Sequence, residues 1–388
     1  MQIEIRPVDT LFFRDGRPFS MGDESWANGI FPPAPSVIYG ALRAAYFSEK
    51  NLLHNNRDEL DALTQDFRIT ALSFIFTPAA NERQEQLFPL PLDCVKDKND
   101  DDCRELAVME LKEVAPGLQS SYAENLPLRG SHLLMTDRFS QYEQVADGLF
   151  SFSQLKKYLE ASMPEPFAGK RVARLTTLEP KIGIGREAET HKAAESKLYR
   201  IDARRLATRY DADEAGRLSL CVECEGLDDF PRQGLLKLGA EGKSAVYRVA
   251  ESTDTLSVPP PGLKGRRFKL YMATPACFRK GWYPEWIENP ACLAPAFDGE
   301  ALKLLAAAVG TPISIGGFDI KRGKPKAMRK AVPPGSVYVL EASEQCDLPA
   351  LIQRVHGKSI SEFGDETKEG FGICYVGSIN ETAECRNP

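Results

Sequence analysis

Apolar and polar positions change their period several times along this chain of 388 residues. Alternation over 2–8 predicts a first strand, and apolar residues at helical spacing predict a helix over about 36–47. A second alternating stretch, 67–77, predicts another strand. Three prolines within 32–35 favour an extended approach to the helix. This order of strand, loop, helix and strand is how a ferredoxin-like unit begins.

The pattern further along predicts an α+β protein of two domains, with the first covering 1–215 and the second covering 216–388. Residues from 78 to about 130 are rich in proline and acidic residues, which predicts a surface insertion in the first domain. Later stretches predict helices near 152–159, 300–309 and 349–355, and strands near 218–222, 268–272, 336–340 and 371–376.

The start of the first helix has the features of an anion site. Ser36 stands where an N-cap residue is expected, after the prolines and ahead of the small Gly40. Open backbone N–H groups and the helix dipole at such a start bind phosphate without a side-chain charge. An ordinary capped helix is the alternative interpretation of the same residues.

Charge is distributed unevenly in a chain whose net charge is −6. The segment 170–209 has eleven Lys or Arg against five Asp or Glu, and 316–330 has six against one. Segregated charge favours one face for a phosphate backbone, and a solvated charged face is the alternative for either run. The net negative charge argues against indiscriminate binding of nucleic acid.

Nine scattered cysteines indicate free thiols in a reducing compartment, so we expect a cytoplasmic protein. The single C-x-x-C motif, Cys221 with Cys224, lacks the second pair that a structural zinc site needs, and it lies in a predicted strand. We therefore expect no metal and no cofactor. No apolar run reaches the roughly 20 residues that a membrane span needs, so we expect no membrane partner.

The basic segment contains Gly183 and Gly185, which lack the third glycine or the Gly-Lys-Ser/Thr of a nucleotide-binding turn. Close approach of the backbone to RNA and a bend in a strand are the two interpretations. The polar stretch 187–199 predicts a projecting hairpin or finger. His191 within it is a weak candidate general base, because no second acid or base accompanies it.

Three blocks of sequence resemble one known family. They are Pro7–Phe19 with Gly29–Arg43, then Ile182–Glu187 with Lys197–Arg200, and finally Gly370–Gly377. They are similar to the third subunit of the Cmr-type (type III-B) CRISPR effector complex, a RAMP protein. The resemblance extends over nearly the whole chain and implies two ferredoxin-like (RRM-like) domains with insertions.

The resemblance also implies a function without catalysis: binding of the repeat-derived 5′ tag of the guide RNA (crRNA). Its partners would be the large palm-domain subunit and the RAMP backbone subunit. Basic and aromatic side chains that hold single-stranded RNA, and glycines that let it approach, are the candidates. The implied RNA-binding residues are Arg14, Arg17, Ser36, Tyr39, Arg43, Lys181, Gly183, Gly185, Arg186, Arg200, Gly370 and Gly372.

Two alternatives remain open from the sequence. One is a repeat-cleaving RAMP endoribonuclease that processes the crRNA precursor with His191 as base, and the other is a structural adaptor without direct RNA contact. The last glycine block also departs from the commoner RAMP spacing, being slightly shorter, which makes Gly370 and Gly372 weaker candidates than Ser36.

Overall fold

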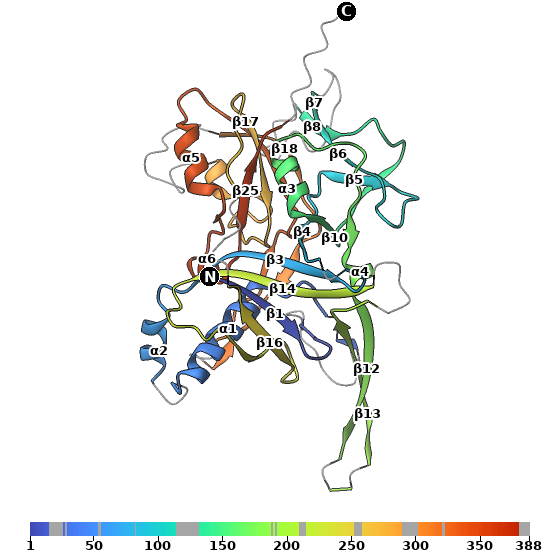
Figure 1. The fold of residues 1–388 in the computed structure, drawn as a ribbon, viewed down its shortest axis with the longest axis vertical. Helices are drawn as coiled ribbons and strands as arrows, with labels where there is room; N and C mark the ends of the chain where they lie inside the picture. Colours follow the sequence, from blue (N-terminus) through green and yellow to red (C-terminus); the bar gives the residue numbers. More distant parts are fainter. Residues whose placement is uncertain are drawn as a thin grey trace, which may run out of the picture.

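The protein was analysed as a computed structural model. The structure describes residues 1–14, 26–27, 29–52, 56–81, 83–113, 132–187, 189–190, 192–208, 215–251, 258–288, 302–319 and 323–379. Figure 1 shows two main sheets stacked along the long axis of the molecule, with a long hairpin extending from the lower one. The α+β class expected from the sequence is confirmed.

The first sheet is built around four antiparallel strands with the ferredoxin-like order. Strands β3 (Arg68–Pro78), β14 (Gly216–Glu225), β1 (Gln2–Pro7) and β16 (Ser244–Val249) are neighbours in that order. This is the arrangement in which the third strand lies between the first two and the fourth lies beyond the first. The sheet continues to eight strands through β4 (Glu85–Pro89), β10 (Gly148–Ser151) and β11 (Lys170–Arg171) at one edge and β15 (Gln233–Lys237) at the other.

Helix α1 (Pro35–Glu49) covers one face of this sheet, as its apolar positions predict. Its buried side chains include Ile38, Leu42 and Ala45, at the three- and four-residue spacing of one helix face. They pack against Ile3 and Ile5 of β1 in the main core. The short α2 (Arg57–Leu63) follows α1.

The second sheet repeats the same strand order. Its five strands are β18 (Leu302–Ala308), β23 (Val337–Ala342), β17 (Arg267–Met272), β25 (Ile373–Gly377) and β24 (Lys358–Ser359), in spatial order. Helix α5 (Leu348–Val355) lies between β23 and β25 in sequence, where the second ferredoxin-like helix belongs. The short η1 (Glu285–Ile287) follows β17, and α6 (Gly364–Glu369) precedes β25.

Both faces of the first sheet are covered. Leu218 and Leu220 of β14 lie in the core beneath α1, while the alternate residues Ser219 and Cys221 are also buried. The second domain lies on that other side, as Figure 1 shows, and Tyr271 of β17 belongs to the same core cluster. One core cluster therefore extends over both sheets, and the α5 side of the second sheet has a separate cluster.

The first sheet does not end at residue 215, where the sequence analysis placed a domain boundary. Strands β14, β15 and β16 all belong to it. The second sheet begins only at β17. We therefore propose that the boundary lies between residues 249 and 267.

The segment expected to be a surface insertion contributes to the core instead. Phe88, Leu90 and Leu92 are all buried, and β4 pairs with β3 and β10. Pro89 and Pro91 end strand β4, but the strand stays buried because Leu90 and Leu92 pack into the core. Beyond this strand come β5 (Cys94–Asp97), β6 (Leu106–Val108), β7 (Glu110–Glu113), β8 (His132–Met135) and β9 (Tyr142–Gln144). Helices α3 (Phe152–Leu159), as predicted, and α4 (Val172–Leu175) complete this region.

The helix predicted over 300–309 is wrong, because its described part is strand β18. This strand pairs with β23 along its length and has buried side chains on both faces, among them Leu304 and Leu305. A short apolar run buried on both sides has no period that separates strand from helix. Its alanines and leucines favour helix intrinsically, and the sheet contacts outweigh that preference.

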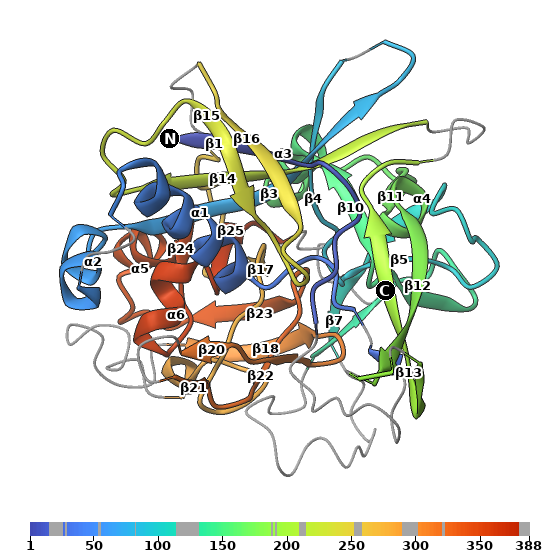
Figure 2. The same ribbon diagram turned by 90° about the horizontal axis from the view of Figure 1, so that it is seen from below.

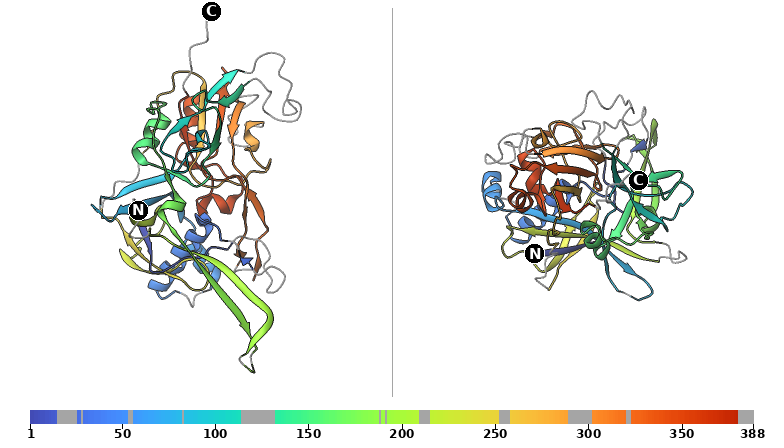
Figure 3. Two further views of the ribbon diagram at one scale, coloured as in Figure 1. Left: turned by 90° about the vertical axis from the view of Figure 1, so that its right-hand side faces the viewer. Right: turned by 90° about the horizontal axis from the view of Figure 1, so that it is seen from above.

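The two basic segments form separate hairpins. Strands β12 (Thr177–Arg186) and β13 (Ala193–Arg205) pair over most of their length, and β2 (Trp26–Ala27) adds to β13. The left view in Figure 3 shows this hairpin projecting well away from the body, as the sequence predicts. Smaller strands form the second: β19 (Ile313–Ile315), β20 (Phe318–Asp319), β21 (Lys324–Pro325) and β22 (Arg329–Ala331).

Candidate nucleic-acid interface

Helix α1 begins slightly earlier than predicted. Its N-cap is Ala34, which has no side chain able to cap, and Pro35 occupies the first helical position. Ser36 therefore lies inside the first turn, so the prediction that it caps the helix is wrong. The reason is that proline at the first helical position fixes its own φ near the helical value and starts the helix there.

Ser36 nevertheless lines an open cavity, which we call the α1–α6 cavity. Its volume is about 640 Å³, and it lies between the start of α1, helix α6 and the small strands β19–β22. The cavity is lined by Ser36, Arg279, Ile315, Gly316, Lys324, Pro325, Lys326, Ala327, Arg329, Glu362, Phe363, Gly364, Glu366, Glu369 and Phe371. Four of these side chains are cationic and three are carboxylates, so its lining carries a net charge of +1.

Two cations of the cavity are held by carboxylates of the α6 segment. Lys326 Nζ lies 3.0 Å from Glu369 Oε1, and Arg329 Nε lies 3.3 Å from Glu366 Oε1. The guanidinium of Arg329 also lies 3.6 Å from the centre of the Phe363 ring. A guanidinium on an aromatic face beside an open cavity is an arrangement that also suits nucleobases and phosphates.

Gly370 and Gly372 adjoin this cavity and are required by the backbone. Both have positive φ, 94° and 73°, and Gly370 ends α6 in the left-handed conformation. A Cβ at Gly370 would lie 2.8 Å from the Ile69 side chain, and one at Gly372 would lie 2.4 Å from the Ser361 backbone nitrogen. These glycines therefore let the chain pass close to β3 and to Ser361, and need no RNA to explain them.

Tyr39 and Arg43 make contacts within the protein. The Tyr39 ring stacks on Phe67 with centroids 4.3 Å apart. Arg43 Nε donates a hydrogen bond to Thr64 Oγ1 at 2.7 Å, and its guanidinium pairs with Asp61 of α2. These two predicted site residues join α1 to its neighbours, and the structure does not bring them to the cavity lining.

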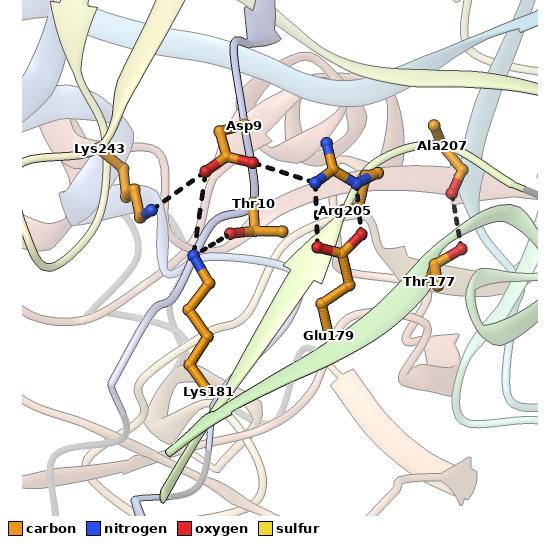
Figure 4. Close-up of polar contacts among 8 residues, drawn as sticks. All are labelled: Asp9, Thr10, Thr177, Glu179, Lys181, Arg205, Ala207 and Lys243. Atoms are coloured by element: carbon orange, nitrogen blue, oxygen red, sulfur yellow. Dashed lines mark hydrogen bonds and ion pairs between the residues drawn. The ribbon is translucent and has the colours of Figure 1, made fainter. Parts of the chain in front are cut away.

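The base of the long hairpin is a network of charged side chains around Asp9 (Figure 4). Asp9 lies 3.3 Å from Lys243 Nζ, 3.1 Å from Arg205 Nη2 and 3.9 Å from Lys181 Nζ. Arg205 also forms a bidentate pair with Glu179. These contacts tie the root of the hairpin to the segment that follows β1.

The same network explains the titration of its members. A hydrogen bond from the Thr10 backbone, followed by the Lys243 ammonium, lowers the pKa of Asp9 to about 2. The pKa of Lys181 is also lowered, chiefly because the Lys243 ammonium lies beside it. Lys181 donates a hydrogen bond to Thr10 Oγ1 at 3.0 Å, so this predicted RNA-binding residue also makes a contact within the protein.

Other predicted residues lie further along the hairpin. At Gly183 a Cβ would meet the Tyr199 ring at 2.1 Å, so the glycine lets that ring lie flat across the strand. Gly185 follows on the same strand, and Arg186 is exposed near the tip. Arg200 Nε donates to Asp202 Oδ1 at 3.2 Å.

Arg14 forms an isolated antiparallel β-bridge with Gly29. Arg17 and His191 lie outside the described residues. Figure 2 shows the hairpin and β20–β22 at opposite sides of the view from below. The predicted set is therefore divided between two places.

Four cationic residues of the cavity were missed individually by the sequence analysis: Arg279, Lys324, Lys326 and Arg329. The charge count over 316–330 did indicate three of them as a group. Arg279 carried no such signal, because its contribution depends on the chain after β17 turning back towards α6.

Within the described ranges no three His, Cys, Asp or Glu side chains are arranged to hold a metal ion. Cys221 and Cys224 lie buried with free thiols on β14, as the strand prediction requires. Burial raises the pKa of each thiol to about 12, which leaves both uncharged near neutral pH. Among the described helices, none has the length and apolar character needed to cross a bilayer.

Comparisons with known proteins find similar chains among solved structures and one matching family. A chain in the cryo-EM structure of the type III-B Cmr-beta complex bound to cognate target RNA is similar, with 17% identity and a TM-score of 0.46 over 87% of this chain and 86% of that one. A chain in the crystal structure of the Csm3–Csm4 subcomplex of the type III-A CRISPR-Cas interference complex has 11% identity and a TM-score of 0.34, covering 87% and 92%.

A comparison with curated protein sequences finds no relative. The profile of the family described as CRISPR-associated protein (Cas_Cmr3) matches residues 3–379, almost the entire chain. The chain therefore belongs to the Cmr3 family, whose members are subunits of the type III-B CRISPR effector complex.

Proposed function

We propose that this subunit binds the repeat-derived 5′ tag of crRNA, with the α1–α6 cavity as its principal contact. The observation that carries the proposal is the meeting of Ser36, the cations Lys324, Lys326 and Arg329, and an aromatic ring at one open cavity. Single-stranded RNA is held by cations that follow phosphates and by planar groups that stack on bases. The long hairpin is a second contact, through Lys181 and Arg186.

We propose the tag as the ligand, rather than RNA of any sequence, because the lining of the cavity carries a net charge of only +1. Such a lining gives a weak sequence-independent attraction, so affinity has to come from contacts with particular nucleotides. We further propose that the subunit is not catalytic and joins the large palm-domain subunit to the RAMP backbone subunit. Family membership supports a structural role in the complex.

Filter binding with tag-bearing and tagless RNA, followed by a gel of the bound RNA, tests the proposal. The wild type should prefer tag-bearing RNA and leave both RNAs intact, with and without Mg²⁺. Lys324→Glu with Arg329→Glu should abolish that preference, whereas Lys98→Glu with Lys157→Glu, which reverses two exposed charges elsewhere, should preserve it. Equal binding of both RNAs by the wild type would overturn the tag assignment.

The same gel separates the alternatives. Cleavage that persists through further purification and is lost in His191→Ala would establish the endoribonuclease. Absence of binding to either RNA, with retention of the neighbouring subunits in co-purification, would establish the structural adaptor.

Ser36→Asp tests the start of α1 directly. Ser36 does not cap the helix, so Ser36→Ala should leave stability almost unchanged, and an acidic residue in the first turn is favourable to the helix dipole. If RNA phosphate lies beside Ser36, the Asp variant should fold normally and bind tag-bearing RNA more weakly at low salt. Wild-type affinity in that variant would remove α1 from the binding site.

A further inference from the structure

Helix α6 places carboxylates on the very cations that the proposed RNA site would use. The helix is short, Gly364–Glu369, and it runs along the α1–α6 cavity up to Gly370. Glu366 and Glu369 point at Arg329 and Lys326, as the distances above show. The remaining cavity cation of that hairpin, Lys324, is exposed and has no ion pair among the described residues.

The carboxylates of Glu366 and Glu369 are much less exposed to solvent than the cations with which they pair. The side chains of Glu366 and Glu369 are each only 13% exposed, while Arg329 and Lys326 are 37% and 43% exposed. The second oxygen of Glu366 accepts a hydrogen bond from Ser361 Oγ at 3.3 Å. The acidic side of each pair is therefore shielded from solvent, with Glu366 also held by Ser361, and the basic side faces the open cavity.

A carboxylate and a phosphate oxygen make the same kind of charge-assisted hydrogen bond to Lys and Arg. A partly exposed cation can therefore exchange one for the other without a large rearrangement. When RNA displaces it, the Glu366 carboxylate keeps its hydrogen bond from the Ser361 hydroxyl.

We infer that Glu366 and Glu369 are built-in competitors of RNA phosphate, which occupy Arg329 and Lys326 in the free subunit and are displaced by the crRNA tag. The inference rests on the proposed function. Its consequence is that every RNA entering the cavity has to separate two ion pairs. RNA that makes only phosphate contacts then binds too weakly to remain, whereas the tag has base contacts in addition.

The test is the double variant Glu366→Gln with Glu369→Gln, which keeps the shape of both side chains and the acceptor for Ser361. A matched control, Glu225→Gln with Glu341→Gln, removes two carboxylates from the exposed or half-exposed ion pairs with Arg68 and Arg267. Both double variants change the net charge equally, so long-range attraction of RNA changes equally.

We expect the Glu366→Gln, Glu369→Gln variant to bind both tag-bearing and tagless RNA about twofold to thirtyfold more tightly than the wild type, since each partly exposed pair contributes about 0.2–1 kcal/mol. Its affinity should also fall more steeply with salt, because two more cations are free to take phosphates. The control should gain much less. Thermal unfolding confirms that both variants fold, and the single variant Glu369→Gln, at the end of α6, provides the same test if the double variant does not.

The outcomes separate the inference from the proposed function. A wild type that prefers tag-bearing RNA, with no gain in the variant beyond the control, overturns the competitor and leaves tag binding standing. A gain for both RNAs over a wild type without tag preference supports the competitor and overturns the tag. Absence of RNA binding in every variant overturns both.

Discussion

Asp9 and Asp93 each lie among cations, and their surroundings give them opposite properties. Asp9 is half exposed at the root of the hairpin, and a backbone hydrogen bond and Lys243 lower its pKa. Asp93 is buried, and desolvation raises its pKa in spite of Lys269 and Tyr158 beside it. The same kind of ion pair therefore holds a hairpin in contact with solvent at Asp9 and joins Asp93 to strand β17 in the interior.

The buried cluster of Asp93, Tyr158 and Lys269 lies where helix α3 meets the second sheet. Tyr158 of α3 donates hydrogen bonds to Asp93 at 2.7 and 2.8 Å. Lys269 of β17 lies 4.0 Å from Asp93, with its ammonium 3.4 Å from the centre of the Tyr158 ring. Because water does not screen these charges, removing one partner leaves the other uncompensated.

The largest expected effect is therefore in Asp93→Ala. It leaves the Lys269 ammonium buried without its counter-charge, which costs about 3–5 kcal/mol in the free energy of unfolding. Denaturant unfolding followed by circular dichroism measures the decrease. A decrease below about 1 kcal/mol would mean that the buried cluster contributes no more to stability than the exposed ion pairs around Asp9.

Replacing both charges sharpens the comparison. Asp93→Asn with Lys269→Met keeps an acceptor for Tyr158 and removes both charges, so it should recover most of the stability that Asp93→Ala loses. The same unfolding experiment measures it. Additive decreases from the two replacements would contradict the interpretation that an unpaired charge is the cause.

The hairpin should matter for RNA more than for stability. Lys181→Glu with Arg186→Glu should flatten the dependence of log affinity on log salt by about 0.7 for each phosphate that is no longer neutralised. Lys98→Glu with Lys157→Glu is the control. Lys96 is unsuitable for it, because its side chain is 3% exposed and paired with Glu143. Equal salt dependence of the affinity in both variants would mean that the charges of the hairpin face solvent and not RNA.

Asp9 should have the smallest effect. Asp9→Asn should cost at most about 1 kcal/mol of stability, and less at high salt, because exposed pairs are weak and screened. The pKa of Asp9 is about 2 in the folded protein, below the ordinary value of 3.8. The stability that Asp9 contributes is therefore complete above about pH 3.8 and is lost as the pH falls towards 2. Unfolding of the wild type and the variant at about pH 6 and about pH 2 measures this, and a difference that persists at the lower pH would contradict it.

Local pattern predicted the elements in which apolar residues recur with a clear period. Strands β1 and β3 and helices α1, α3 and α5 all show a clear period, and the structure confirms them. Strand β18 and the region around Phe88 are buried on more than one side, so their sequences have no period to read. The prolines that predicted a surface loop there instead end a core strand.

The candidate site was predictable only where its residues are close in sequence. The basic run at 316–330 was visible as a count of charges, and Ser36 was singled out by the prolines before it. The pairing of Asp93 with Lys269 and the position of Arg279 depend on contacts between distant segments. No spacing within either segment indicates them.

Each ferredoxin-like sheet shows a single helix of the pair among the described residues, and the helices differ: the first sheet has α1 and the second has α5. The second sheet has a hydrophobic cluster of its own on the face that α5 covers, but its other face belongs to the main core that it shares with the first sheet. We therefore expect the chain to unfold in a single cooperative transition. Either half expressed separately should be less stable than it is in the whole chain, because the part of the main core that it shares would be exposed to solvent.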